Sequence, residues 1–193
     1  MPRVEDFVRE DVLKKMVLVF HEKGYNATSM QDLVDASQLN RSSIYNSFGN
    51  KLSIFLECLR MYQGYLTRET SSILMQSSNS FDAISSIFNL FYGYTVADKD
   101  NKGCLLSNCV SEMANQNNQI TTFLKHHQNA MLGLFEDLIY QGQQSGEINK
   151  NMTHKAYAAY LYSSIQGLRN VGILLNDKRK LKSIIDITLE NLK

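Results

Sequence analysis

Residues 23–55 read KGYNATSMQDLVDASQLNRSSIYNSFGNKLSIF, and the spacing of polar and apolar residues in this stretch decides the fold of the N-terminal region. An amphipathic helix is expected over residues 7–23, because apolar residues recur there at steps of three and four, and Gly24 is expected to end it. Thr28 is predicted to open a short second helix as its N-cap, with Gln31 three residues later completing a capping box.

A tight turn and a third helix follow in the same stretch. The turn is expected at residues 37–39, and Asn40 is predicted to cap a helix that runs to Phe48 and is stopped by Gly49. Ile44 and Phe48 share one face of this helix and are expected to be buried. Three short helices, the last two joined by a tight turn, are typical of a helix-turn-helix unit.

The residues around the third helix have the chemistry of a surface that contacts DNA. Arg41 and Lys51 each occupy the first position of a predicted helix, where the helix dipole disfavours a positive charge. A phosphate at either position would meet backbone N–H groups, the positive end of the dipole and a cation together. Hydroxyl and amide groups that suit base edges and phosphates lie between them, on Ser42, Ser43, Tyr45 and Asn46. The alternative for each residue taken singly is a solvated helix surface.

The stretch resembles the N-terminal signature of TetR-family transcriptional regulators. The resemblance is carried by Gly24, Tyr25, Thr28, Leu33, Val34, Ala36, Leu39, Ile44, Tyr45, Phe48 and Lys51. It implies a homodimer that represses transcription by binding a palindromic double-stranded DNA operator. Binding of a small-molecule effector would release this homodimer from the operator. The resemblance also implies that Thr28 and Lys51 contact phosphates and that the helix from Arg41 to Asn46 enters the major groove. The full set expected at the DNA is Thr28, Ser29, Gln38, Asn40, Arg41, Ser42, Ser43, Tyr45, Asn46 and Lys51.

One position departs from the family pattern. Gln38 stands in the turn where the family often has glycine, so it is expected either to adopt a positive φ at some energetic cost or to change the turn slightly. The departure bears on the geometry of the turn and not on the resemblance of the surrounding residues.

The rest of the chain is predicted to be helical. Pro2 is the single proline among 193 residues, and this scarcity favours long helices. Helices are expected over residues 51–74, 81–97, 104–114, 119–144, 153–174 and 178–192, with polar breaks between them, the last at 176–177. The expected fold class is therefore all-α with about nine helices. It divides into a helix-turn-helix DNA-binding domain over residues 1–55 and a helical effector-binding and dimerisation domain over residues 56–193.

Cys104 lies in a segment, Gly103 to Asn108, that resembles the Gly-Cys-Leu opening found in one large subgroup of the TetR family. It follows Lys99 and Lys102 closely and lies near a predicted helix N-terminus, features that make a thiol more reactive. Cys104 is therefore a candidate sensor of oxidants or electrophiles. The alternative is an inert apolar residue, which is the more common role of a lone cysteine.

A ligand cavity is expected among the middle helices, which are rich in large, adaptable and polar-tipped side chains. The candidates for its lining are Met61, Tyr65, Phe88, Phe91, Tyr92, Cys104, Asn108, Phe123, His127, Met131, Tyr160 and Gln166. Taken singly, an aromatic residue or a methionine at helical spacing is more often part of the core.

The last two predicted helices are candidates for a dimer interface. Small residues on one and an apolar stripe on the other would let them form a four-helix bundle with their symmetry mates. The candidates are Ala159, Ser163, Gly167, Leu181, Ile184, Ile185 and Leu189. The alternative is that both helices pack within the monomer. A dimer is favoured because a single helix-turn-helix unit contacts too few base pairs to be selective.

Composition and residue spacing argue against several other classes of protein. The formal net charge is only +1, so the case for DNA rests on local placement. The chain shows neither an apolar run long enough for a membrane span nor an N-terminal signal peptide, so a cytoplasmic protein without membrane contact is expected. The spacing of cysteines and histidines suits neither a disulfide framework nor a metal site, and no cofactor is expected.

No nucleophile-base pair, paired-carboxylate site or glycine-rich phosphate loop is found at recognisable spacing, so the chain is not expected to be an enzyme. Two alternatives to a ligand-released repressor remain open. One is an activator or thiol-sensing regulator of the same fold, and the other is a helical protein-interaction module that does not bind DNA.

Overall fold

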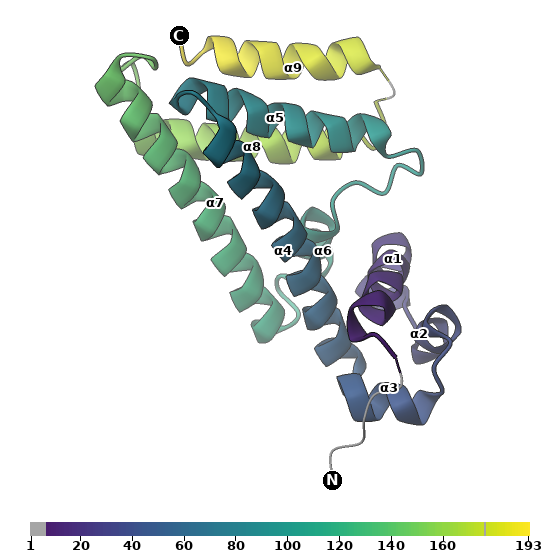
Figure 1. The fold of residues 1–193 in the computed structure, drawn as a ribbon. Helices are drawn as coiled ribbons and strands as arrows, with labels where there is room; N and C mark the ends of the chain where they lie inside the picture. Colours follow the sequence, from purple (N-terminus) through teal and green to yellow (C-terminus); the bar gives the residue numbers. More distant parts are fainter. Residues whose placement is uncertain (1–6, 176) are drawn as a thin grey trace.

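The computed structural model describes residues 7–175 and 177–193 of the chain. Residues 1–6, which include Pro2, and Asn176, which belongs to the expected break before the last helix, lie outside the described residues. Within the described part the chain forms nine α-helices, and the expected all-helical fold class is confirmed (Figure 1).

The first three helices form a small unit at one end of the molecule (Figure 1). α1 spans Arg9–Ala27, α2 spans Met30–Ser37 and α3 spans Arg41–Phe48. They share an apolar core with the first turns of the fourth helix. The buried side chains of this core include Met16, Phe20, Leu33, Ile44, Phe48, Ile54 and Phe55. We call α1–α3 the reader unit.

α1 does not end where expected. Gly24 has φ 74° and ψ 178°, which lies outside the helical region, but the helical turn resumes and continues to Ala27. A positive φ is readily adopted only by glycine, so this residue bends the helix instead of ending it. The bend directs the last turn of α1 toward the start of α2.

The N-cap of α2 is Ser29 and not Thr28, so the predicted cap was wrong by one position. The Ser29 hydroxyl accepts from the backbone N–H of Asp32 at 3.1 Å, and the Asp32 carboxylate accepts from the backbone N–H of Ser29 at 2.8 Å. Gln31 is outside this capping box and donates instead to the Asp35 carboxylate at 2.8 Å. Thr28 cannot cap because its side chain is turned inward and only 1% exposed.

Six further helices build the rest of the molecule, close to the expected boundaries. They are α4 (Lys51–Gln76), α5 (Ser80–Ala97), α6 (Leu105–Met113), α7 (Asn118–Ser145), α8 (His154–Val171) and α9 (Lys178–Glu190). Most begin at a side-chain cap, provided by Asn50, Asn79, Asn117, Thr153 and Asp177 for α4, α5, α7, α8 and α9. α8 ends three residues earlier than predicted, in a turn that begins at Gly172.

The arrangement places α4 and α6 between the reader unit and the remaining helices (Figure 1). α4 runs from the end of α3 to the far end of the molecule, where α5, α8 and α9 are layered and the long α7 packs against α5 and α8. The short α6 contacts α1, α4 and α7. Any change in the larger part can therefore reach the reader unit through α4 or α6. In the part of the chain that the structure describes, no helix is long and apolar enough to span a membrane.

Candidate nucleic-acid interface

α3 presents a polar face on an apolar base. Ile44 and Phe48 are buried, as expected, at 0% and 3% exposure. Arg41, Ser42, Tyr45 and Asn46 are exposed, and Ser43 is half-buried. The expected division of the helix into a core face and an outward polar face is therefore confirmed. Its outer surface carries one cation with hydroxyl and amide groups, which can donate to phosphates and to base edges.

The turn before α3 has the strained conformation that the sequence predicts. Gln38 adopts φ 62° and ψ 18°, in the left-handed region, and its backbone N–H donates to the carbonyl of Val34 at 2.9 Å. Its side-chain amide donates to the carbonyl of Asp35 at 2.6 Å. Asn40 then caps α3 by accepting from the backbone N–H of Ser43 at 2.8 Å. Gln38 therefore closes the end of α2, and Asn40 begins α3.

Arg9 fixes the other end of α3, a role that the sequence analysis missed. Its Nη1 donates to the carbonyl of Ser47 at 2.7 Å, and its Nη2 lies 2.8 Å from both carboxylate oxygens of Glu57. The guanidinium also lies 4.2 Å from the centre of the Phe48 ring. Arg9 is distant in sequence from all three residues, so only the packing of α1 reveals the contact.

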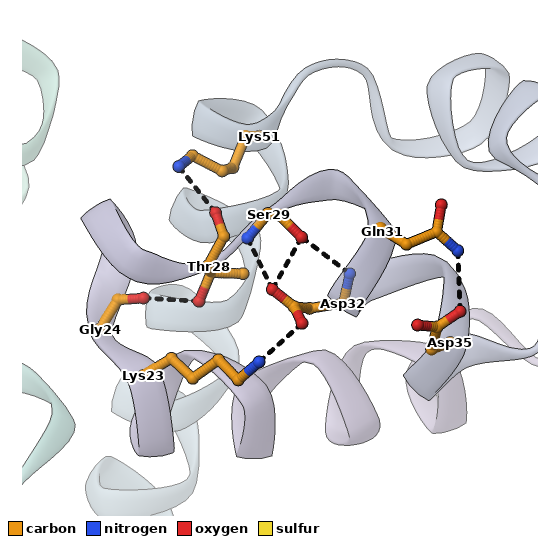
Figure 2. Close-up of polar contacts among 8 residues, drawn as sticks. All are labelled: Lys23, Gly24, Thr28, Ser29, Gln31, Asp32, Asp35 and Lys51. Carbon is orange, nitrogen blue, oxygen red and sulfur yellow. Dashed lines mark hydrogen bonds and ion pairs between the residues drawn. The ribbon is translucent and has the colours of Figure 1, made fainter.

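Lys51 holds the junction between α1 and α2 (Figure 2). Its ammonium donates to the carbonyls of Tyr25 at 2.9 Å and Thr28 at 2.8 Å, and lies 4.4 Å from the centre of the Tyr25 ring. The Thr28 hydroxyl donates to the carbonyl of Gly24 at 2.6 Å. Lys51 thus has a structural role besides the phosphate contact that the resemblance implies, and that contact stays a prediction. Thr28, being buried, does not present its hydroxyl at the surface.

An ion pair between α1 and α2 strengthens the same junction (Figure 2). Lys23 Nζ lies 2.6 Å from the Asp32 carboxylate. The hydrogen bond from Lys23, helped by those from the backbone and hydroxyl of Ser29, lowers the pKa of Asp32 to about 2. Asp32 is therefore ionised throughout the neutral range and keeps both the cap and the ion pair.

Glu112 of α6 reaches across to the reader unit. Its carboxylate accepts from the backbone N–H groups of Tyr25 at 2.9 Å and Asn26 at 2.7 Å. A β-carbon at Gly24 would lie 2.8 Å from the same carboxylate, so only glycine leaves room for it there. Lys51 of α4 and Glu112 of α6 therefore both hold the bend in α1.

A cavity of about 420 Å³ lies among α4–α8. Its described lining is Gln63, Leu66, Thr67, Thr70, Ser71, Leu74, Phe91, Cys104, Leu106, Ser107, Val110, Ala114, Asn115, Thr121, Leu124, Lys125, His127, Gln128, Ala130, Met131, Leu134, Tyr162, Ile165, Gln166 and Arg169. Five of the expected candidates, Phe91, Cys104, His127, Met131 and Gln166, are among them. A volume of this size suits a small organic molecule.

The other candidates for the cavity lie elsewhere. Phe88 is fully buried and packs against Phe135, with ring centres 6.4 Å apart. Tyr92 donates to the carbonyl of Lys178, and Asn108 donates to the carbonyl of Lys102. Met61, Tyr65, Phe123 and Tyr160 are also absent from the described lining. Helical spacing identifies residues that face inward or outward but does not separate a core wall from a cavity wall.

The polar groups of the cavity are mostly neutral. Gln63 Nε2 lies 3.3 Å from Nδ1 of His127, and Ser107 donates to Gln166 at 2.5 Å. Burial, with a smaller effect of the Arg169 charge, lowers the pKa of His127. Cys104 lies in the wall and is 5% exposed.

The two halves of the expected dimer interface have different surroundings. Ala159, Ser163 and Gly167 are exposed on α8, as an interface requires. Leu181, Ile185 and Leu189 are buried within the protomer, and Ile184 is half-buried, because this stripe of α9 covers α5 and α8. The burial of Leu181, Ile185 and Leu189 within the protomer contradicts their assignment to a dimer interface, whereas the assignment of Ile184 stays a prediction.

Two family models match the chain. Residues 15–58, which cover most of the reader unit and the start of α4, match the model described as bacterial regulatory proteins, tetR family. Residues 81–188 match the model of the tetracyclin repressor-like C-terminal domain. The second match alone spans more than half of the chain.

Curated relatives and solved structures agree with these matches. The chain is 27% identical over 160 residues to the HTH-type transcriptional repressor DhaR of Mycobacterium sp. (strain GP1), covering 83% of this chain and 79% of that protein. It is 25% identical over 193 residues, the whole of both chains, to an uncharacterized HTH-type transcriptional regulator, YezE of Bacillus subtilis (strain 168). Its fold is similar to that of a cysteine mutant of the TetR family regulator CifR, complexed with 26-bp double-strand operator DNA, with a TM-score of 0.84 and 20% identity. That likeness covers 99% of this chain and 100% of the CifR chain.

Proposed function

Because the chain belongs to the tetR family of bacterial regulatory proteins, we propose that it is a ligand-responsive DNA-binding regulator that represses transcription from a palindromic operator. The observation that carries the proposal is the outer face of α3, where Arg41, Tyr45 and Asn46 are exposed above a buried apolar base. A polar recognition helix held at both ends suits insertion into a major groove. The relative DhaR carries the name of a transcriptional repressor, which supports this mode of action.

In the proposed complex α3 lies in the major groove and the exposed ends of the reader unit face the backbone. Arg41, at the start of α3, would pair with a phosphate or a guanine edge, and Ser42 and Asn46 would hydrogen-bond to bases. Two copies of α3 in a dimer would occupy successive grooves about 34 to 36 Å apart. The operator would then be a palindrome whose half-sites follow the two-fold symmetry of the protein.

The proposed homodimer forms through the outer face of α8. Ala159, Ser163 and Gly167 are exposed along one side of this helix, where small residues allow another helix to approach closely. Two apolar side chains of the same two helices are also exposed, Val171 of α8 at 45% and Ile187 of α9 at 64%. Pairing this face with its symmetry mate would cover apolar surface that the protomer leaves in water.

Effector binding would reach the reader unit through α6 as well as through α4. Leu106, Ser107 and Val110 of α6 line the cavity, and Glu112 on the same helix holds the bend in α1. A ligand that displaces α6 by a small amount would therefore move the contact with α1 and change the spacing of the two reader units. Such coupling requires that the ligand bind the two arrangements with different affinity.

The membership of the Gly-Cys-Leu subgroup, a cytoplasmic location and the absence of enzymatic activity are part of this proposal. Gly103, Cys104 and Leu105 support the first, because they stand directly before and at the start of α6. The function of the family supports the other two, since regulators that bind chromosomal DNA act in the cytoplasm without chemical turnover.

Selection of bound sites from a random double-stranded DNA library by the full-length protein tests the proposal, together with its mass in solution. The expected result is one enriched palindrome and the mass of a dimer. A variant with Arg41, Tyr45 and Asn46 changed to alanine is the control, because these side chains are exposed and their removal should spare the fold. It should keep the helical content and lose the enrichment. A folded dimer that enriches no sequence would contradict the proposal and favour a protein-interaction module.

A further inference from the structure

Arg169 of α8 is a buried cation in the wall of the cavity. It is 7% exposed, and its Nη2 donates to the Tyr62 hydroxyl at 3.3 Å. Its guanidinium carbon lies 5.4 Å from the centre of the Phe91 ring. Among residues 7–175 and 177–193, no carboxylate forms an ion pair with it. A guanidinium has five N–H donors, so most of its hydrogen-bonding capacity is unused here.

The two phenols beside this guanidinium do not supply the missing negative charge. The side chains that interact with it electrostatically include those of Cys104, Tyr62 and Tyr94. Burial raises the pKa of Tyr62 to about 12, and it also raises the pKa of Tyr94, so both phenols are neutral near pH 7. The Tyr94 hydroxyl is buried and has no hydrogen-bond partner among the described residues.

The described cavity lining has cations but no acid. It contains Arg169 and the exposed Lys125, and neither Asp nor Glu is among its residues. A buried charge without a counter-charge is unfavourable, because desolvation is not offset by a partner. An anion that enters the cavity would supply that partner.

We propose, building on the ligand-responsive function above, that the effector is a small monocarboxylic acid whose carboxylate pairs with Arg169. The planar guanidinium matches a carboxylate with two parallel N–H···O bonds, which gives both affinity and orientation. One buried cation favours a single negative charge. The hydroxyl of Ser107 and the amide of Gln166 lie in the same wall and can adjust to the head group.

The rest of the cavity indicates an apolar body on this acid. Along α4 the lining extends from Gln63 to Leu74, which corresponds to roughly 16 Å at the rise of an α-helix. Tyr62, the partner of Arg169, precedes Gln63, so the charged site is at one end of this length. Leu66, Leu134 and Leu74 line the remainder. A straight-chain or aromatic carboxylic acid fits this combination of one charged end and an apolar groove.

Titration calorimetry with matched pairs of acids and amides tests the proposal on the full-length protein. The probes are straight-chain acids from butyrate to dodecanoate, benzoate, and the neutral amide of each. The expected result is that at least one acid binds and that its amide binds roughly ten- to hundredfold more weakly, the loss of hydrogen bonds to a charged group. Equal binding of the acid and its amide would overturn the proposal, and so would the failure of every acid to bind. This comparison needs no variant and does not depend on how a mutant folds.

Two variants locate the site. Arg169→Gln should lower the affinity for the acid by a similar factor and abolish the preference over the amide. Arg68→Gln, which removes an exposed cation from α4 outside the lining, should leave both unchanged. An Arg169→Gln protein that is folded and still prefers the acid would overturn the assignment.

Operator binding, measured separately, distinguishes the two proposals. Acid binding at Arg169 without any effect on DNA would support the carboxylate site and contradict its role as an effector site. DNA binding by a protein that binds none of the acids would keep the regulator and reject the carboxylate site.

Discussion

Replacement of Lys51 by methionine separates two roles that this lysine can have. The resemblance to TetR regulators implies a phosphate contact, whereas the structure shows its ammonium bound to the carbonyls of Tyr25 and Thr28. Methionine keeps most of the apolar stem and removes the charge and the donors. If the structural role is correct, Lys51→Met destabilises the protein even in the absence of DNA.

The expected loss follows from the contacts of Lys51. Each hydrogen bond from a charged donor contributes about 1.5–3 kcal/mol when water is excluded. Solvent at this half-buried site reduces that contribution, and the ammonium 4.4 Å from the Tyr25 ring adds about 0.5–1 kcal/mol. We therefore expect a decrease of about 2–3 kcal/mol in the free energy of unfolding. For a chain of this size the melting temperature would fall by about 4–12 °C.

Chemical and thermal denaturation of the free protein, followed by circular dichroism, measures this loss. Lys15→Met is the matched control, because Lys15 is an exposed lysine on α1 and its replacement should leave the stability nearly unchanged. The reasoning is refuted if Lys51→Met is as stable as the wild-type protein and only its DNA affinity falls. That outcome would mean that the two carbonyl contacts contribute nothing and that Lys51 serves phosphate alone.

Three further predictions concern the DNA contact, the link between the domains and the dimer. Arg41→Ala should leave the melting temperature unchanged, because Arg41 is exposed. It should also reduce the steepness of the plot of log K for DNA binding against log salt concentration by about 1 for each protomer. An unchanged slope in a filter-binding titration would exclude a phosphate contact. Glu112→Gln should lower the free energy of unfolding by about 1–3 kcal/mol, because an uncharged amide replaces the carboxylate that accepts from the backbone N–H groups of Tyr25 and Asn26. Equal denaturation midpoints for variant and wild type would show that this contact does not stabilise the protein. Gly167→Glu should halve the mass measured by light scattering and preserve the helical content, because no atom of the described residues lies within 4 Å of a β-carbon at this position. A variant that stays dimeric would rule out this face of α8.

Features that depend on neighbours in the chain were predicted well. Asn40 and Asn50 cap α3 and α4, and Gln38 adopts the positive φ that the missing glycine implies. Each of these features rests on hydrogen bonds between residues three or four positions apart. Local spacing fixes such bonds whatever the rest of the chain does.

Features that depend on which surfaces pack against each other could not be predicted from neighbouring residues in the sequence. Thr28 and Ser29 are equally good caps by composition, and the choice between them was made by the burial of Thr28 beneath the bend at Gly24. The apolar stripe at Leu181 and Ile185 shows that one face of α9 is covered. It does not show whether the cover is a second protomer or, as found, α5 and α8 of the same one.

The sequence by itself determined the reader unit, the outward face of α3 and most of the helices with their caps, because helical periodicity and capping act over a few residues; the cap of α2 is the exception. The tertiary structure alone decided which polar group each of several charged side chains meets. Arg9 reaches Ser47, Glu112 reaches Tyr25, and Arg169 reaches Tyr62 across 38, 87 and 107 positions of the chain. No local pattern records such contacts, since each of them forms only when the packing of whole helices brings a side chain to a distant backbone or side-chain group. The same packing leaves Arg169 at a cavity whose described lining has no acid, and this makes it the most informative residue for the search for an effector.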